Sequence, residues 1–300
     1  MNKKTKKNQA TALEFTVNEQ SELLPFLLEV LSNRSRNSVK SILTRGQVTI
    51  NGKVITAHNH MLQIGEKVTI QKNKVAKAKA DSPIDLNILY EDSDVIVIDK
   101  QPGLLSVASS KEKDVTAYRQ LMTHVKSENT NNRIFIVHRL DRDTSGVMMF
   151  AKNEKVKRIL QDAWKEKVEE RTYIALVEGA VKKQSDTIST WLKESKTLKM
   201  YSSDQPNGGQ HAVTHYKVLK TNDKTSLLEV QLETGRKNQI RVHMEAIGHP
   251  IVGDKKYGAK NLGIGRLGLH AKVLAFSHPI SGKILRFESA TPKVFYKLFK

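Results

Sequence analysis

Cysteine is absent from the 300-residue sequence, which excludes disulfide bonds, thiolate zinc ligands and a cysteine nucleophile. The sequence also lacks any run of eighteen apolar residues, so we expect no membrane-spanning helix. The polar start of the chain, Met1 to Gln9, lacks the apolar stretch of a secretory signal, and a cytoplasmic protein fits best. Neither a glycine-rich phosphate loop nor a dinucleotide-binding fingerprint is present.

Positive charge dominates the composition, with 50 Lys and Arg against 31 Asp and Glu, a net charge of +19. Such an excess indicates a polyanionic partner, because cations that neutralise phosphates release counterions. A protein with a merely basic bias is the plainer alternative. An anionic membrane surface ranks last, since no basic amphipathic helix with aromatic anchors is evident. Up to Ile84 there are 14 basic and 6 acidic residues, against 36 and 25 in the rest, so the first part is about twice as basic per residue.

The residues up to Lys72 show a compact order of elements. Leucines recur at helical spacing over Leu23–Leu31, and a basic helix is predicted over Asn37–Thr44, stopped by Gly46. Asn51-Gly52 between alternating residues predicts a hairpin, because both turn positions need a positive φ. A further strand is predicted over Lys67–Ile70.

Within this order, four pieces of sequence resemble the RNA-binding domain first described in ribosomal protein S-four: Ser35-Arg36, Ile42, Gly46-Gln47-Val48 and Val48–Lys53. The resemblance implies that basic side chains of the helix region bind RNA, namely Arg34, Arg36, Lys40 and Arg45. The alternative is a small α+β domain with a solvated basic face. The charge of +19 favours RNA.

The remaining residues alternate short strands with helices and hairpin turns. Because strands dominate, we predict an α+β fold with a mixed, mainly antiparallel sheet that carries helices. We predict one helix that Asn153 caps and whose apolar stripe runs through Trp164 to Val168. The other predicted elements are helices at Thr116–Lys126 and Ile240–Ile247 and strands at Val95–Ile98, Val147–Phe150, Thr172–Val177, Tyr216–Leu219, Leu227–Leu232, Ala271–Phe276 and Ile284–Glu288.

The densest group of polar residues is His138–Gly146, between the apolar segments Ile134–Val137 and Val147–Phe150. A polar loop between two buried strands is a typical place for a functional site. The alternative is a turn held by salt bridges. Asp141 and Asp143 lie in the same loop, and spacing alone does not choose between them.

This loop resembles the His-Arg-Leu-Asp-x-x-Thr-Ser-Gly signature of the RluA-type RNA pseudouridine synthases at every fixed position. Arg171–Val177 resembles a second family element, and Thr234–His243 a third, followed by Gly248–Asp254 and Tyr257-Gly258. The resemblance covers most of residues 85–292. It implies a pseudouridine synthase fold and an isomerase that converts chosen uridines in RNA.

The resemblance also implies roles for single residues. Asp141 matches the catalytic aspartate, Arg241 its charge partner, and Tyr173 the residue that stacks on the base and helps to remove the C5 proton. His138, Arg139 and Ile240 are implied in substrate binding, with Arg139 as a wedge in the base stack. The plainer alternatives are a buried tyrosine at Tyr173, a structural His138, and an ion pair between Arg139 and Asp143.

Three departures from the family pattern leave the substrate and the local loop geometry open. Pro102 is displaced by one position, Ala108 stands where proline is common, and Lys237-Asn238 replaces a frequent Thr-His pair.

The reaction needs few catalytic groups. Glycosidases use two carboxylates, one of them for the leaving group. Uracil leaves as a delocalised anion that stays in its pocket, so one carboxylate suffices. Asp141 attacks C1′ or removes the C2′ proton, and both routes stay open.

We therefore expect a basic disordered tail at residues 1–12, an S-four-type RNA-binding domain at 13–72, a lysine-rich linker at 73–84 and a synthase domain at 85–300. We expect a monomer without metal or cofactor that acts on large-subunit ribosomal RNA, with transfer RNA as the second choice. One rival is a non-enzymatic RNA-binding or ribosome-assembly protein. Another is a metal-dependent hydrolase that uses Asp141, Asp143 and His138. His211 and His215 have the spacing of a metal pair but no third ligand is suggested.

Overall fold

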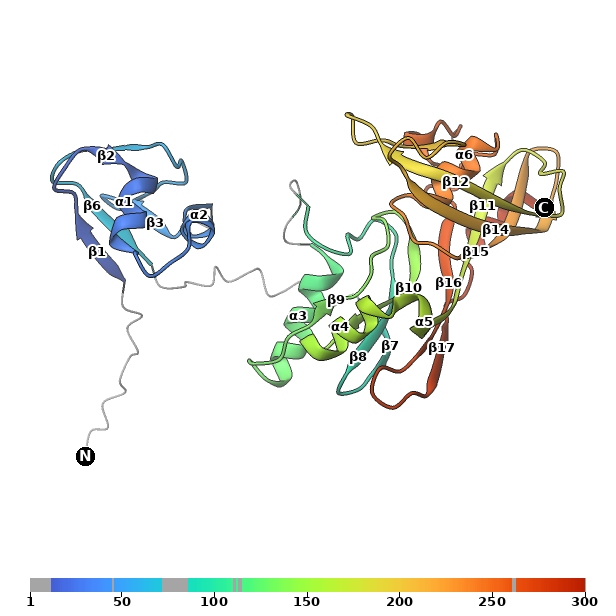
Figure 1. The fold of residues 1–300 in the computed structure, drawn as a ribbon, viewed down its shortest axis with the longest axis horizontal. Helices are drawn as coiled ribbons and strands as arrows, with labels where there is room; N and C mark the ends of the chain where they lie inside the picture. Colours follow the sequence, from blue (N-terminus) through green and yellow to red (C-terminus); the bar gives the residue numbers. More distant parts are fainter. Residues whose placement is uncertain are drawn as a thin grey trace. The chain divides into compact units, whose positions relative to one another are not determined.

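The computed structural model describes residues 12–44, 46–71, 86–109, 112, 115–260 and 263–299. The chain divides into two compact units, Met1–Ser82 and Pro83–Lys300 (Figure 1). Arg45, the predicted linker and nearly all of the predicted tail lie outside the described residues, so the predicted segment boundaries stay a prediction. Within the described residues, none of the helices has both the length and the apolar character needed to cross a membrane.

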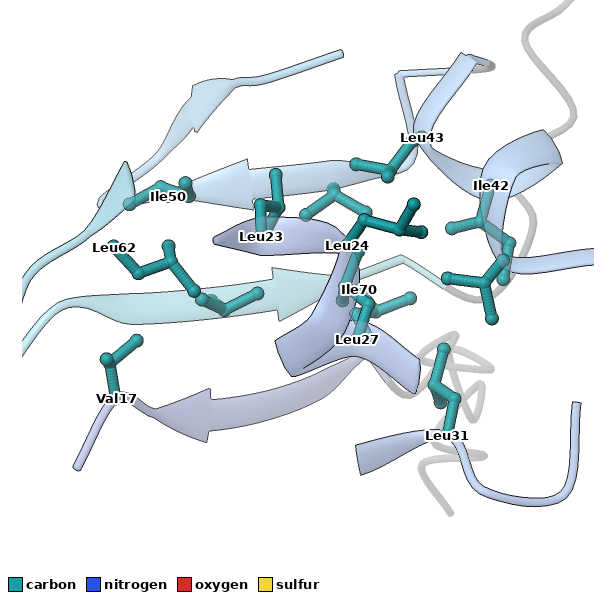
Figure 2. Packing of buried hydrophobic residues seen from close by; sticks show 13 residues of the cluster. Val17, Leu23, Leu24, Leu27, Leu31, Ile42, Leu43, Ile50, Leu62 and Ile70 are labelled. Carbon is teal, nitrogen blue, oxygen red and sulfur yellow. The ribbon is translucent and has the colours of Figure 1, made fainter. Parts of the chain in front are cut away.

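The first unit is a small antiparallel sheet covered by two helices. Figure 2 shows Leu27, Ile42 and Ile70 converging on its interior, and all three are nearly or fully buried. The Asn51-Gly52 hairpin has the predicted geometry, with φ of 47° and 82°. The sheet has the order β1-β6-β3-β4, beside a β2-β5 pair. The elements are β1 (Leu13–Thr16), β2 (Ser21–Glu22), α1 (Leu23–Val30), α2 (Arg36–Thr44), β3 (Val48–Ile50), β4 (Lys53–Val54), β5 (Met61–Leu62) and β6 (Lys67–Ile70).

The second unit is built on an eleven-stranded sheet with the order β13-β12-β14-β15-β11-β16-β10-β8-β7, with β17 paired to β16 and β9 to β10. The pairs are antiparallel except for β10 with β16, which confirms the mixed, mainly antiparallel α+β fold. The strands are β7 (Asn87–Glu91), β8 (Val95–Lys100), β9 (Phe135–Ile136), β10 (Ser145–Ala151), β11 (Val168–Glu178), β12 (Ser185–Glu194), β13 (Met200–Ser203), β14 (Gln210–Thr221), β15 (Thr225–Leu232), β16 (Leu269–Ser277) and β17 (Ile284–Glu288).

The parallel contact between β10 and β16 explains one residue of the polar loop. Gly146 pairs with Ala271 and has a φ of 113°. A Cβ atom at Gly146 would lie 2.0 Å from the Ala271 carbonyl oxygen, so no larger residue fits here.

Helices cover both faces of the sheet around β8 and β10. α3 (Ala117–Glu128) packs with Ile96 and Ile98, while α4 (Glu154–Asp162) packs with Val95 and Val97 on the other face. This alternation is the period of two of a strand that is buried on both faces. α6 (Gln239–Ala246) covers the β11, β14 and β15 region of the sheet. Two short 3-10 helices, η1 (Lys255–Tyr257) and η2 (Lys293–Phe299), complete this unit.

The helix predicted to run from Asn153 to Val168 is wrong in its second half. Asn153 caps α4 as predicted, with its Oδ1 2.8 Å from the Val156 nitrogen, but α4 ends at Asp162. A single turn, α5 (Trp164–Lys167), follows, and Val168 opens β11 by pairing with Phe276. Sheet pairing therefore overrides the helical period at the end of the stripe.

Strands β12 and β13 were not predicted. In β12 the buried side chains are Ile188 and Leu192, which lie four residues apart. An alternation this sparse carries little strand signal, and the strand forms because β14 and β13 flank it.

Candidate active site

The loop that contains Asp141 is held by side chains that form hydrogen bonds with its backbone on both sides of that residue. Ser106 Oγ donates to the Leu140 carbonyl at 2.7 Å and accepts from the Leu140 nitrogen at 3.2 Å. The fully buried Lys100 extends its ammonium to the carbonyls of Gln101, Leu104 and Arg142 at 2.9, 2.8 and 3.0 Å. These contacts fix the position of the loop against β8.

The Asp141 carboxylate is paired with Arg241 from α6. Arg241 Nη1 donates to Asp141 Oδ2 at 3.0 Å, while its Nε and Nη2 bind the two oxygens of Asp254 at 2.6 and 2.8 Å. Burial favours a lower pKa for Arg241, but the hydrogen bonds and charge of Asp254, with the charge of Asp141, hold its pKa above the ordinary value. Arg241 is therefore a permanent cation that Asp254 orients toward Asp141.

Asn238 provides a second donor to the same carboxylate. Its Nδ2 lies 2.6 Å from Asp141 Oδ2, and its Oδ1 accepts a bond from the Tyr257 hydroxyl at 3.2 Å. Asn238 caps α6 in the left-handed conformation, with φ 53° and ψ 23°, which asparagine tolerates better than most residues. The Tyr257 ring also lies under Arg241, with 5.0 Å between the guanidinium carbon and the ring centroid.

Three residues of this arrangement received no role in the sequence analysis: Asn238, Asp254 and Tyr257. All three lie in or beside segments that resemble the family. Asp254 is only 2% exposed, and a buried carboxylate needs a charged or hydrogen-bonding partner. The sequence alone reveals neither this burial nor the pairing with Arg241.

Tyr173 and Ile240 lie beside Asp141. Tyr173 is half-buried on β11, and Ile240 is 4% exposed on α6. Burial raises the pKa of Tyr173, and the charge of Asp141 acts in the same direction against the opposing charge of Arg171. The Tyr173 phenol is therefore protonated at neutral pH.

Asp141 lines three cavities at once. A small niche of about 70 Å³ is bordered by Asp141, Tyr173 and Ile240. A cavity of about 800 Å³ extends from Asp141 toward Trp164, and another of about 830 Å³ extends toward Arg266. The paired carboxylate thus stands where the three spaces meet.

His138 has a structural contact. Its Nε2 accepts a hydrogen bond from the Met149 nitrogen at 3.1 Å, and burial lowers its pKa to about 3. The ring is therefore neutral at physiological pH. Arg139 is exposed and borders the niche, while Asp143 pairs with Arg142 at 3.1 Å.

Three of the four predicted RNA-binding residues of the first unit are described, and they lie on or next to α2. Arg34 and Arg36 are exposed and Lys40 is half-buried. Arg45 lies outside the described residues, so its predicted contact is not described.

The described residues do not gather the metal ligands of the hydrolase rival. Their groups of three possible ligands are Glu91, His124, Glu128 and Asp92, Asp94, His278. Neither group includes Asp141, Asp143 or His138. The two histidines with the spacing of a metal pair, for which no metal site was predicted, have other partners: His211 contacts Ser189 Oγ at 2.9 Å and His215 contacts Glu233 at 2.6 Å.

The fold and site are those of an enzyme for a polyanionic substrate, in which the Asp141 carboxylate pairs with Arg241 between cavities whose linings carry several cations. Residues 94–246 match the model of the family described as RNA pseudouridylate synthase. The uncharacterized RNA pseudouridine synthase YlyB of Bacillus subtilis is 37% identical over 273 residues, covering 89% of each chain. Ribosomal large subunit pseudouridine synthase D of Vibrio cholerae is 33% identical, covering 88% of this chain and 86% of its own. A solved structure, human RNA pseudouridylate synthase domain containing 1, aligns with a TM-score of 0.57 and 26% identity, covering 69% of this chain and 84% of its own.

The chain belongs to the RNA pseudouridylate synthase family, and it is an isomerase that forms pseudouridine in RNA. The resemblance to the RluA-type synthases is thereby confirmed, and the rival of a non-enzymatic RNA-binding protein is set aside.

Proposed function

We propose that the chain converts uridines of large-subunit ribosomal RNA to pseudouridine, with Asp141 as its single catalytic carboxylate. The observation that carries this proposal is the position of Asp141, which is paired with Arg241 at 3.0 Å where three cavities meet. A carboxylate at such a junction reaches both a base in the small niche and the RNA backbone attached to that base.

The reaction breaks the N1–C1′ bond, turns the uracil and joins C5 to C1′. C5 loses its proton in the last step and N1 gains one, so atoms and charge balance. In one route Asp141 attacks C1′ and forms an ester that C5 later displaces. In the other it removes the C2′ proton and returns it after the base has turned. Both routes use the Asp141 carboxylate, and the permanent cation Arg241 lies 3.0 Å from its Oδ2.

We assign the niche to the target base. Ile240 supplies an apolar wall, and we assign the Tyr173 ring, which also borders the niche, to stacking on uracil. Because its phenol is protonated, Tyr173 helps the C5 proton to leave through a hydrogen bond and not as a preformed phenolate. Arg139 borders the niche as an exposed cation and fills the space of the extracted nucleotide.

The ribosomal substrate is supported by two observations. A relative of similar length is named as a large-subunit ribosomal synthase. The first unit carries the exposed cations Arg34 and Arg36 beside Lys40, which suit a folded RNA. We assign that unit, including Arg45, to RNA binding and His138 to the wall of the substrate site.

We further propose that the enzyme works as a cytoplasmic monomer without metal or cofactor. The chemistry itself supports the last point, because uracil leaves and returns within one pocket and no water needs activation. Activity on a short RNA should survive exhaustive treatment with EDTA, while restoration by stoichiometric zinc or manganese would favour the hydrolase.

Two experiments test the proposal. Asp141→Asn should abolish tritium release from C5-labelled uridine in RNA while RNA binding persists, and Asp143→Asn in the same loop is the matched control that keeps substantial activity. Wild-type turnover of Asp141→Asn would sink the catalytic assignment. Pseudouridine mapping in total RNA of a deletion strain then identifies the substrate, and losses confined to transfer RNA would contradict the ribosomal assignment.

A further inference from the structure

The cavity between Asp141 and Trp164, called the Trp164 cavity here, is far larger than the niche for the target base. Its volume is about 800 Å³, against about 70 Å³ for the niche. Cavities of roughly 300–1,000 Å³ hold whole drug-sized ligands. The Trp164 cavity therefore has room for a nucleotide in addition to the target uridine.

The charge of this lining suits a nucleic acid chain. Its charged members are one acid, Asp141, and five cations: Arg139, Arg142, Arg171, Arg236 and Lys237. Since Asp141 is itself paired with Arg241, the field inside the cavity is positive. This positive field stabilises the phosphates on either side of a nucleotide that enters the cavity.

The wall of the cavity carries a flat aromatic surface. Trp164 lies half-buried at the start of α5, where the chain leaves α4 at Ala163. Its ring packs on His138, with 5.0 Å between the ring centroids and 39° between the planes. His138 is a neutral ring anchored by the Met149 nitrogen. The ring contact with this anchored imidazole helps to hold the indole in place.

Polar side chains around the indole are also held before any ligand arrives. Gln161 Nε2 donates to the Ile136 carbonyl at 3.0 Å. Arg171 Nη2 donates to the carbonyls of Leu232 and Glu233 at 2.8 and 2.9 Å. An aromatic wall with fixed polar neighbours and cations is the combination by which proteins bind unpaired bases.

We propose that the Trp164 cavity is a second nucleobase subsite, which takes an unpaired base next to the target uridine and stacks it on Trp164. This inference rests on the proposed function, in which Asp141 receives the target nucleotide. It adds a requirement for the substrate: the nucleotide beside the target must also leave its helix, so loops bind and uninterrupted duplexes do not.

Intrinsic fluorescence tests the subsite directly, because Trp164 and Trp191 are the two tryptophans of the chain. In a Trp191→Phe protein, Trp164 is the sole indole. The probes are a stem-loop RNA and a duplex RNA of equal length. We expect the stem-loop to quench Trp164 emission as it binds, and the duplex to leave the emission unchanged. The same stem-loop with abasic sites beside the loop uridine should lose the quench.

Affinity provides the second measurement, by anisotropy of the end-labelled stem-loop. Trp164→Leu keeps an apolar side chain and removes the stacking face, and we expect binding to weaken roughly 5- to 150-fold. Trp164→Phe should keep most of the affinity. Trp191→Leu is the matched control, since Trp191 is also half-buried and packs on a histidine, His211, at 5.1 Å, but lines none of the three cavities. Its affinity should equal that of the wild type.

Stem-loop binding without any change in Trp164 emission would overturn the subsite, as would wild-type affinity of a folded Trp164→Leu protein. Should Trp164→Leu fail to fold, the emission of the Trp191→Phe protein decides alone. Tritium release from a C5-labelled large-subunit ribosomal transcript is measured in parallel. Quenching without turnover would overturn the proposed substrate and leave the subsite standing. Turnover without quenching would overturn the subsite and leave the proposed substrate standing.

Discussion

Asn238 donates to the Asp141 carboxylate at 2.6 Å, on the same oxygen, Oδ2, that accepts the bond from Arg241. Among the described residues, the other carboxylate oxygen, Oδ1, accepts no hydrogen bond of this kind. The carboxylate is thus held by one oxygen, and the other is the one that we assign to the proposed reaction. The Tyr257 hydroxyl sets which end of the Asn238 amide faces Asp141.

We expect Asn238→Asp to lower kcat at least about tenfold at neutral pH, because it replaces a donor by a second carboxylate and hydrogen bonds to charged groups contribute roughly 1.5–3 kcal/mol. The acid limb of the kcat profile should move to higher pH, since two adjacent carboxylates resist joint ionisation. Asn238→Gly keeps the left-handed backbone and should lose less. Tritium release across pH measures both, and an unchanged profile for Asn238→Asp would show that the contact has no catalytic part.

We expect Tyr173→Phe to keep RNA affinity, because the ring remains, and to lower kcat by roughly 10²–10⁴-fold, the usual effect of losing a proton-transfer group. Tyr173→Leu should weaken affinity as well, since it removes the stacking surface. Steady-state kcat and KM with C5-labelled RNA separate the two effects. Wild-type kcat for Tyr173→Phe would assign Tyr173 to packing alone.

We expect Lys100→Met to destabilise the second unit by about 3 kcal/mol, because three carbonyls lose the ammonium of a fully buried side chain. Chemical denaturation measures the free energy of unfolding. Lys183→Met is the matched control: its ammonium binds Asp186 on the surface with the Lys183 side chain 73% exposed, and its loss should change little. Equal stability of the two variants would contradict a clamping role for Lys100.

His243 should make the protein sensitive to mild acid. It is fully buried between the hydroxyls of Thr190 and Thr214, and burial lowers its pKa from 6.5 to about 4. Between these values the unfolded chain binds a proton that the folded chain does not, so stability falls as pH drops from 6.5 toward 4, by at most about 1.4 kcal/mol per pH unit. In His243→Gln this contribution is absent. The difference in unfolding free energy between wild type and variant should therefore shrink with acid, and a constant difference would refute the linkage.

The first unit should contribute affinity and no chemistry. Changing Arg34, Arg36 and Lys40 together to Gln should weaken binding to a long RNA and reduce the salt slope by up to roughly three, while kcat on saturating short RNA stays the same. Lys182, Lys183 and Lys224 changed to Gln remove the same charge from the second unit, away from its three cavities, as a control. Equal salt slopes in the two variants would argue against RNA binding by the first unit.

Local residue patterns were sufficient for much of the architecture and for the family. The Asn51-Gly52 turn has positive φ at both positions, as its residue types predicted, and Asn153 caps α4. Such features depend on a few neighbouring residues whose backbone preferences act at short range. The His138–Gly146 motif likewise led to the pseudouridine synthases, because it is contiguous.

Contacts between segments that are distant in the sequence could be identified only from the tertiary structure. Asn238 and Asp141 are 97 positions apart, and Arg241 and Asp141 are 100 apart. The sequence motifs implied the second pair through the family, but the donor role of Asn238 and the buried Asp254 behind Arg241 had no local signal. The same limit explains Val168 and β12, where pairing with distant strands outweighed the helical period or a sparse alternation. Helix caps and turns are encoded by adjacent residues, whereas a hydrogen bond across the sheet exists only once packing has brought its two partners within reach.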